Sequence, residues 1–425
     1  MDIAIPTGTF DILPEDPKEI WRSSHLWSYV EKIMRDHAAS YGLEEIRTPI
    51  FERTELFCRS VGDSSDIVKK EMYTFEDKGG RMISLRPEGT ASVVRSFVEK
   101  QLHTKSPSHR FFYIGPMFRY ERPQSGRFRQ HHQFGTEVFG LGNPEIDAEQ
   151  IAMCYSLYEK LGLKKLTVYI NSLGDPVARA KFRTAFTTFL APQLDKLSAD
   201  SQSRFHTNPL RIFDSKDEGD KEIIKKAPTI LDFLSPECQA HFNDVQKYLT
   251  HLGIPFQVNS FLVRGLDYYT RTVFEVVVGE LGAQNSIAGG GRYDGLVKEL
   301  GGPDIPSIGF ATGIERVIQT LLGQNVPLPE RPRPHLYLIP LGDEATLFAF
   351  SLAKELRSHN ISCLQDTNRK KLKQAMQQAS SSRALFTIVL GEDELQKGVC
   401  NIKEMDTGKE KSIPLNEIPL FFELK

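Results

Sequence analysis

The sequence predicts a protein of mixed α/β (α+β) class, with a large antiparallel sheet that carries a helical insertion and a small α/β domain after it. Three observations support this prediction. Two apolar-rich runs within residues 111–139 flank a polar stretch, as in a β-hairpin. Residues 175–253 become polar and helical in pattern. Residues 324–334 hold four prolines, which stiffen a linker, and strand–helix alternation follows them.

The N-terminal part is expected to contain a helix and then strands. Apolar side chains recur at three- and four-residue spacing over 15–41, which predicts an amphipathic helix that ends at Gly42. Pro49 excludes a continuing helix and favours an edge strand or a bulge. A strand is expected to end in the polar turn of 81–90, with a helix after it. Another amphipathic helix is expected over 144–162.

The middle of the chain is expected to alternate between sheet and helices. A short strand is predicted over 165–171, and the helical insertion follows over about 175–253. The main sheet is then expected to resume within 254–280, where apolar and β-branched residues return.

The proline-rich stretch is the strongest domain boundary in the chain. We place a linker at 325–334, which separates a first domain of residues 1–324 from a second of residues 335–425. Short apolar strands in the second domain are separated by helical runs near 343–359 and 368–380. Alternation on this scale predicts a small α/β domain.

Composition bounds the class of protein. A chain of 425 residues with 40% hydrophobic and 25% charged residues is typical of a globular protein with two or three domains. No apolar run approaches the ~20 residues that a membrane span needs. The N-terminus lacks the basic start and apolar block of a secretory signal. The five cysteines are scattered and form no CxxC pair, which argues against a disulfide framework or zinc site and favours the reducing cytoplasm.

A net charge of −2 excludes a basic field over the whole molecule. A nucleic-acid partner would therefore have to bind local patches, either the arginines within 119–129 or the basic run at 369–373. Runs such as the second are more often solvated faces of helices than binding sites.

The polar stretch of the hairpin carries Arg119, Glu121, Arg122, Arg127 and Arg129. A rigid two-stranded platform that presents several guanidinium groups and a carboxylate suits a nucleoside triphosphate, because guanidinium forks match phosphate oxygens. The alternative is a solvated hairpin tip with surface charges.

The order of residues in 118–140 closely resembles motif 2 of the class II aminoacyl-tRNA synthetases, in the form found in the histidyl-tRNA synthetase family. LRPEGT at 85–90, LVRGLDYYTRTVFE at 262–275 and GFATGIER at 309–316 resemble further segments of that family, in the family's order. The region of Pro49 matches the degenerate motif 1, which forms the dimer interface of class II enzymes. The resemblance covers nearly the whole chain and is to the compact bacterial form, without a long N-terminal extension.

This resemblance implies a class II catalytic domain with a helical insertion and a C-terminal anticodon-binding domain. It implies ATP-dependent ligation of L-histidine to its tRNA through histidyl-adenylate, with release of pyrophosphate and AMP, by a cytoplasmic homodimer. Because the first step joins two anions, catalysis would consist mostly of positioning and charge neutralisation. Mg²⁺ is expected to bind mainly through ATP oxygens, with no protein ligand assigned.

The resemblance also implies roles around ATP. Arg119 would hold the α-phosphate, Arg127 and Arg316 the γ-phosphate side, and Glu121 the adenine end. Arg264 would act as a fixed cation beside the α-phosphate during activation. Taken without the motifs, Arg316 would be a surface residue of a helix, and Arg264 would pair with an aspartate at a turn.

The histidine site implied by the resemblance is a polar pocket that rejects amino acids without an imidazole. Glu137 and Tyr269 match the positions that recognise the imidazole. The alternatives are an outward strand residue for Glu137 and core packing for the tyrosines. The residues matched around the amino and carboxylate groups or along the pocket are Glu88, Gly89, Thr90, Gln133, Tyr268 and Tyr293.

Three further features of the sequence bear on the proposed nucleotide and metal sites. The glycine-rich segment 288–302 lacks the Walker lysine and Ser/Thr, so its glycines are expected to allow close approach to a ligand. His131 and His132 have no Cys or His partners at zinc spacing. Phe128 stands where the family commonly has tyrosine, which preserves stacking and loses a hydroxyl.

Two competing functions follow from the same resemblance. A catalytically silent paralogue would act as a regulatory or tRNA-binding subunit, but such relatives typically lack the last domain and parts of the RGLDYY segment, both of which are present here. A class II synthetase for another amino acid is disfavoured by the length of the match at 262–275.

Overall fold

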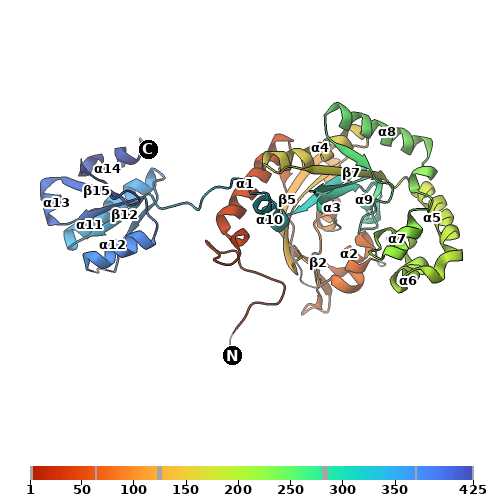
Figure 1. Ribbon diagram of the computed structural model, residues 1–425, viewed down its shortest axis with the longest axis horizontal. Helices are drawn as coiled ribbons and strands as arrows, with labels where there is room; N and C mark the ends of the chain where they lie inside the picture. The colour runs from red at the N-terminus through yellow and green to blue at the C-terminus, as the bar shows by residue number, and fades with distance from the viewer. Residues whose placement is uncertain (1–2, 63–64, 122–126, 280–285, 369–370, 424–425) are drawn as a thin grey trace. The chain divides into compact units, whose positions relative to one another are not determined.

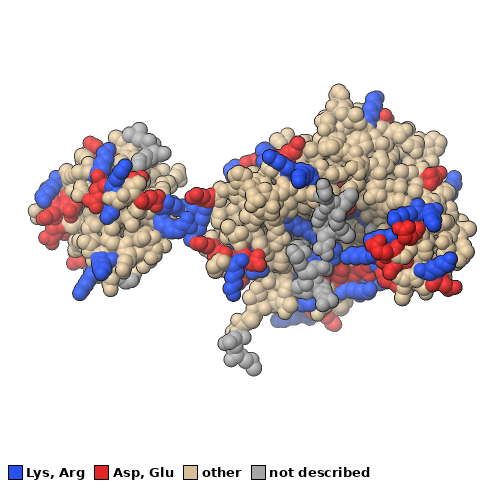
Figure 2. Space-filling view, in the orientation of Figure 1, with Lys and Arg blue, Asp and Glu red and all other residues tan. Residues whose placement is uncertain are grey.

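The computed structural model describes residues 3–62, 65–121, 127–279, 286–368 and 371–423 (Figure 1). Arg122 and residues 369–370 of the predicted basic run lie outside this description. The chain divides into two compact units, Met1–Pro329 and Glu330–Lys425, so the division falls inside the proline-rich stretch. On the face of each unit seen in Figure 2, Lys and Arg side chains mix with Asp and Glu, as the net charge of −2 leads one to expect.

An eight-stranded sheet forms the centre of the first unit, in the order β1-β5-β6-β11-β10-β9-β7-β8. All pairings from β5 to β7 in this order are antiparallel, whereas β1 and β8 pair in parallel at the two edges. The predicted antiparallel sheet is confirmed. The strands are β1 (Glu44–Glu45), β5 (His109–Phe118), β6 (Gln130–Phe139), β7 (Leu166–Ser172), β8 (Phe256–Val258), β9 (Thr270–Val278), β10 (Ser286–Arg292) and β11 (Ser307–Gly313).

β5 and β6 form the predicted hairpin, with an unbroken register from His109 opposite Phe139 to Phe118 opposite Gln130. Side chains alternate between two apolar layers, because successive residues of a strand point to opposite faces. Phe112 and Phe134 pack into the layer on one face, and Phe111, Tyr113 and Phe139 pack into the layer on the other.

The first layer is covered by α1 (Ser24–Ser40), α4 (Pro144–Lys160), α8 (Pro236–His251) and α10 (Ile314–Gly323), and the second by α3 (Thr90–Glu99) and α9 (Leu296–Glu299) (Figure 1). The expected start of the first helix at residue 15 is wrong. α1 begins at Ser24, after the 3-10 turn η1 (Ile20–Arg22). Pro14 and Pro17 lie in the stretch before it, and proline restricts helix formation both at its own position and at the residue before it.

The helical insertion contains α5 (Pro176–Leu190), α6 (Ala199–Thr207) and α7 (Glu218–Ile224), and α8 follows. Asp175, Ser198, Asp217 and Ser235 accept hydrogen bonds from backbone N–H groups at the starts of these four helices, which defines where each begins. α5, α6 and α7 lie together at one side of the unit (Figure 1) and share their own apolar core, which includes Phe182, Phe186 and Ile212.

A separate three-stranded sheet, β2-β4-β3, packs near α2 (Thr54–Val61) and the π-helical turn η2 (Ile67–Glu71). Its strands are β2 (Phe51–Arg53), β3 (Thr74–Glu76) and β4 (Met82–Leu85). Phe51 lies opposite Leu85 and Phe75 opposite Ile83, so these four side chains share one face. Phe51 and Phe75 are 50% and 46% exposed, so apolar side chains of this face are open in a single chain, and Arg53, opposite Ile83, lies on the same face.

The second unit is a five-stranded sheet in the order β13-β12-β14-β15-β16 with helices α11 (Asp343–Ser358) and α12 (Leu372–Ser381). The four predicted strands are β12 (Leu336–Pro340), β13 (Cys363–Gln365), β14 (Phe386–Leu390) and β15 (Val399–Glu404). β16 (Glu410–Pro414), α13 (Glu392–Lys397) and α14 (Ile418–Glu423) were not predicted. Within the described residues of both units, no helix is long and apolar enough to cross a membrane.

Candidate active site

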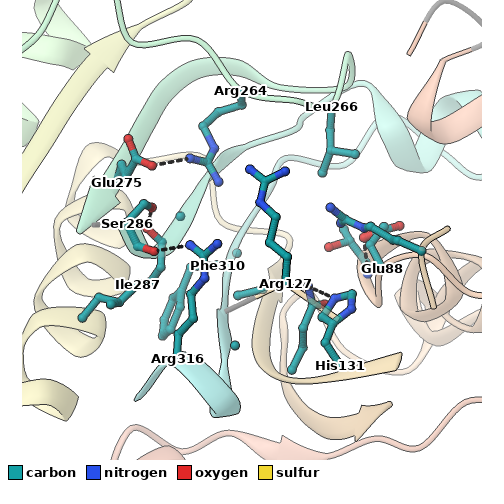
Figure 3. Close-up of a pocket in the computed structure, with 18 of the residues that line it drawn as sticks. Glu88, Arg127, His131, Arg264, Leu266, Glu275, Ser286, Ile287, Phe310 and Arg316 are labelled. Carbon is teal, nitrogen blue, oxygen red and sulfur yellow. Dashed lines mark hydrogen bonds and ion pairs between the residues drawn. The ribbon is translucent and has the colours of Figure 1, made fainter. Parts of the chain in front are cut away.

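A cavity of about 370 Å³ lies over the central strands of the large sheet, and β5, β6, β9, β10 and β11 or their adjoining loops all contribute to it (Figure 3). Eleven of the thirteen site residues proposed from the sequence line this cavity. The two exceptions are Gly89 and Glu137. Segments as far apart in sequence as Glu88 and Arg316 therefore meet at one place.

Arg119, Arg127, Arg264 and Arg316 form a cationic side of the cavity, and three of them donate hydrogen bonds to different acceptors. Arg119 Nε donates to the carbonyl of Pro87 at 2.8 Å. Arg127 donates to Glu121 Oε2 at 3.0 Å. Arg316 donates to the carbonyl of Ser286 at 2.6 Å (Figure 3). Because several guanidinium groups line one side of the cavity, the arrangement suits a ligand with several anionic oxygens.

Burial and nearby positive charges lower the pKa values of two groups on this side of the cavity, Arg316 and His131. Burial, followed by the charge of Arg127, lowers the pKa of Arg316. Burial, followed by the charge of Arg119, lowers the pKa of His131 to about 3, so the imidazole of His131 is neutral at neutral pH. His131 therefore adds no positive charge on this side, where the cationic groups are the arginines.

Arg264 lies against the backbone of β10, beside Glu275 (Figure 3). Its guanidinium is 3.5 Å from Glu275 Oε1, and Glu275 is opposite Gly289 in the sheet register. A Cβ at Gly289 would lie 2.0 Å from Arg264 Nη2, so only glycine leaves room for this placement. Within the described residues, Arg264 Nε is buried without a hydrogen-bond partner.

The opposite side of the cavity is built from a buried carboxylate and aromatic rings. Glu88 accepts hydrogen bonds from the backbone N–H groups of Thr90 at 2.7 Å and Ala91 at 2.8 Å, at the start of α3. Burial raises the pKa of Glu88 despite these bonds. The rings of Tyr268 and Tyr293 are 5.6 Å apart at 67°, an edge-to-face geometry that favours rigid packing.

Glu137 lies behind this wall. Its carboxylate accepts a hydrogen bond from Thr90 Oγ1 at 2.7 Å and another from the Tyr293 hydroxyl. Burial raises the pKa of Glu137 to about 8. A Cβ at Gly309 would lie 2.2 Å from its Oε2. Glu137 therefore does not line the cavity itself. It is hydrogen bonded to the hydroxyl groups of Thr90 and Tyr293, which do line it.

Gly89 leaves room for the ring of Tyr113. A Cβ at Gly89 would lie 2.3 Å from Cζ of Tyr113, and a Cβ at Gly135 would be equally close to the same atom. Glycine at both positions lets the Tyr113 ring lie flat against the backbone beneath the cavity.

The helical insertion holds the segment that carries Arg264 and the two tyrosines. Arg179 of α5 donates to the carbonyl of Tyr269 at 2.9 Å. Arg211 donates to the carbonyl of Gly265, and its guanidinium lies 3.5 Å from Asp267 Oδ1. The irregular stretch between β8 and β9 is therefore fixed from the side of the insertion.

Comparison with known proteins decides the family. The family model described as "Histidyl-tRNA synthetase" matches residues 8–317, about three quarters of the chain. The chain belongs to the histidyl-tRNA synthetase family. The model described as "Anticodon binding domain" matches residues 335–423.

Relatives in this family match over nearly their full length. The chain is 57% identical to the histidine–tRNA ligase of Protochlamydia amoebophila (strain UWE25) over 98% of this chain and 99% of that one. It is 46% identical to the histidine–tRNA ligase of Desulforamulus reducens over 99% of both. The crystal structure of apo S. aureus histidyl-tRNA synthetase is 40% identical, with a TM-score of 0.83 over 99% of this chain and 100% of that one.

The fold is also shared with a protein whose name combines a regulatory subunit and a histidyl-tRNA synthetase. The ATP phosphoribosyltransferase regulatory subunit/histidyl-tRNA synthetase from Bacillus halodurans C aligns with a TM-score of 0.66 at 20% identity. At this identity the likeness concerns the fold alone, and it lends no support to a regulatory role for this chain.

Several residues of the cavity were missed by the sequence analysis, among them Tyr113, Glu275, Ser286 and Glu315. Alternation along β5 places Tyr113 on the same face as Phe111, which was the available signal. Glu315 accepts from the backbone N–H of His132 at 2.8 Å through Oε1, whereas its Oε2 is buried without a partner among the described residues. No local pattern distinguishes this glutamate from a surface residue of α10.

Proposed function

We propose that this chain is a histidine–tRNA ligase. It activates L-histidine with ATP to histidyl-adenylate, releases pyrophosphate, and transfers the histidyl group to the terminal ribose of its tRNA with release of AMP. Identity of 57% over nearly the full length of a histidine–tRNA ligase supports this activity. The observation that carries the proposal is one cavity with arginines on one side and a buried polar pocket on the other.

The cationic side suits ATP. Arg119 and Arg264 would bind the α-phosphate, where negative charge concentrates as the histidine carboxylate attacks and pyrophosphate leaves. Arg127 and Arg316 would bind the γ-phosphate side, and Glu121 would contact the adenine end. Arginines that are already fixed by protein acceptors need little reorganisation when the nucleotide binds, which favours this assignment.

Mg²⁺ fits the site through ATP oxygens. Mg²⁺ typically combines one or two carboxylates with substrate phosphates, and the described residues contain no cluster of three or more metal-ligating side chains. Glu315, with its buried and unpartnered Oε2 on the cavity wall, is the residue that would hold it. When bound, the ion would neutralise phosphate charge.

The opposite side suits histidine. Tyr268, Tyr269 and Tyr293 would enclose the imidazole. Gln133 Oε1, which is buried without a partner among the described residues, is an acceptor for the amino group. Glu88 and Thr90 would contact the amino and carboxylate groups, and Gly89 keeps the segment close to Tyr113.

Glu137 would recognise the imidazole together with the hydroxyls that it holds. A buried carboxyl group with a raised pKa, hydrogen bonded to Thr90 and Tyr293, forms a network that an amino acid without ring nitrogens leaves partly unsatisfied.

The assembly that fits the first unit is a homodimer. The apolar face of the small sheet, with Phe51 and Phe75 exposed, would be covered by a second copy of the chain. Phe51 of this face lies in the segment that matches motif 1, around Pro49. The five cysteines are all described and form no disulfide, which is consistent with a cytoplasmic enzyme.

The domain roles follow from the same assignment. Residues 1–324 form the catalytic domain, with the insertion at about 175–253. Residues 325–334 would form the linker, and residues 335–425 the anticodon-binding domain; the family-model matches at 8–317 and 335–423 support this division. Binding of tRNA to both parts should weaken with rising salt, because phosphate contacts release counterions.

The deciding experiment is amino-acid-dependent ATP–pyrophosphate exchange with the purified chain and Mg²⁺, with each of the twenty amino acids tested separately. Exchange with histidine alone supports the proposal. Exchange with a different amino acid would keep the fold and overturn the pocket assignment. A folded protein with no exchange would instead support a catalytically silent paralogue.

A further inference from the structure

The N-terminal segment of residues 5–13 packs against the end of the β5–β6 hairpin loop, at the point where the chain enters β6. The carbonyl of Gly8 accepts a hydrogen bond from the backbone N–H of Arg129 at 2.7 Å. Gly8 has a φ of +84°, and a Cβ there would lie 2.8 Å from Cγ of Arg129. Both the backbone conformation and the close approach require glycine at this position.

An aromatic cluster strengthens the same contact. The ring of Phe10 lies 4.7 Å from that of Trp21 and 4.9 Å from that of Phe128, and the rings of Trp21 and Phe128 are 5.3 Å apart. Trp21 is buried at 5% exposure and belongs to the main core. Phe128 is therefore held against a rigid part of the domain by its contact with Trp21 and by Phe10, which contacts both rings.

The contact is continuous with the cationic side of the cavity. Phe128 itself lines the cavity, and its neighbours in sequence are Arg127 and Arg129. The carbonyl of Arg129 accepts from the backbone N–H of Arg119 at 2.9 Å. The guanidinium of Arg129 lies 4.0 Å from the centre of the Tyr120 ring, across the two arms of the hairpin. A shift of residues 128–129 would thus move the backbone that carries both phosphate-facing arginines.

We propose that residues 8–10 are a positioning element of the nucleotide site. They contact no substrate, and they hold the exit of the hairpin loop so that Arg119 and Arg127 face the phosphates. This inference rests on the proposed function, because it requires ATP to be the ligand of the cationic side.

A positioning role for residues 8–10 can be distinguished from a general structural role by comparing the KM for ATP with the KM for histidine. The residues proposed for histidine are held by other contacts, such as the bonds from Thr90 and Ala91 to Glu88 and the bond from Arg179 to the carbonyl of Tyr269. Loss of the N-terminal contact should therefore weaken ATP binding and leave histidine binding as it was. A defect in overall folding would affect both.

The test is histidine-dependent ATP–pyrophosphate exchange with Phe10→Ala, with KM measured separately for ATP and for histidine. Loss of two aromatic contacts should raise the KM for ATP about tenfold, with the KM for histidine within twofold of the parent chain. Ile5→Ala is the matched control, since Ile5 is 48% exposed on the same segment. Phe10→Tyr keeps the ring and should restore the KM for ATP.

A double-mutant cycle with Phe128→Ala checks that the effect passes through this contact. If it does, Phe10→Ala should add little to the KM for ATP once Phe128 is Ala, because the shared contact is already lost. If Phe10→Ala does not fold, Phe10→Leu serves in the same cycle. An unchanged KM for ATP, an equal rise in both KM values, or additive effects would each overturn the inference. A parent chain without histidine-dependent exchange would overturn the proposed function instead.

Discussion

Gly289→Ala should disable catalysis without unfolding the protein. The new Cβ would lie 2.0 Å from Arg264 Nη2, and an ordinary contact needs about 3.4 Å or more, so the guanidinium must move by about 1.4 Å. The obstructing atoms belong to the flexible end of an arginine side chain, so the chain can relieve the clash by moving Arg264. Misplacement of a catalytic group by 1 Å can cost about a hundredfold in rate, and a loss of that order is expected here.

The measurement is the maximal rate of histidine-dependent ATP–pyrophosphate exchange, accompanied by the melting temperature. Gly295→Ala is the control, because a Cβ at Gly295 meets nothing within 4 Å and its φ of −81° suits alanine. Gly289→Ala should lose about two orders of magnitude in rate while its melting temperature stays close to that of Gly295→Ala. A Gly289→Ala enzyme with the parent rate would show that the observed place of Arg264 is not needed for activation.

Three further predictions follow from the site and the fold. The Glu137 carboxyl keeps its proton up to a pKa of about 8 in the folded state, whereas the unfolded chain releases it near 4.5. Stability should therefore fall as the pH rises between these values, by roughly 5 kcal/mol at most. Glu137→Gln should lose this pH dependence in denaturant titrations, and parallel curves for both chains would contradict the assignment. Removal of residues 330–425 should reduce tRNA charging far more than histidine activation; equal loss of both would make the last unit a structural support. Phe75→Glu, measured by light scattering, should give a monomer, whereas Val177→Glu, which alters an exposed residue of α5, should not; an intact Phe75→Glu dimer would place the interface elsewhere.

The sequence was most informative where the structural signal is local. Alternation of apolar and polar residues lies within one continuous stretch of chain, so the hairpin that carries Arg119 and Arg127 could be located with its loop in the right place. The prolines likewise lie where the two compact units divide. Motif resemblance then supplied candidates, and most of these line a single cavity.

The remaining features depend on strand pairing over long distances. Glu275 meets Arg264 because β9 and β10 pair in a register that places Glu275 opposite Gly289, and no local pattern encodes that register. Alternation along β6 puts Glu137 on the same face as Phe139, but it does not give the depth of the Glu137 side chain. Its distance from the cavity is set by Thr90 and Tyr293, which arrive from two other parts of the chain.

Arg179 and Arg211 of the helical insertion bind the segment after β8. The insertion and the rest of the catalytic domain are therefore not independent modules. Excision of the insertion would remove the donors that Arg179 and Arg211 supply to the carbonyls of Tyr269 and Gly265. Those carbonyls belong to the stretch that carries Tyr268, Tyr269 and Arg264, the proposed catalytic cation. An insertion exchanged between relatives must therefore bring matching donors at both positions, because these donors hold the segment that lines the catalytic cavity.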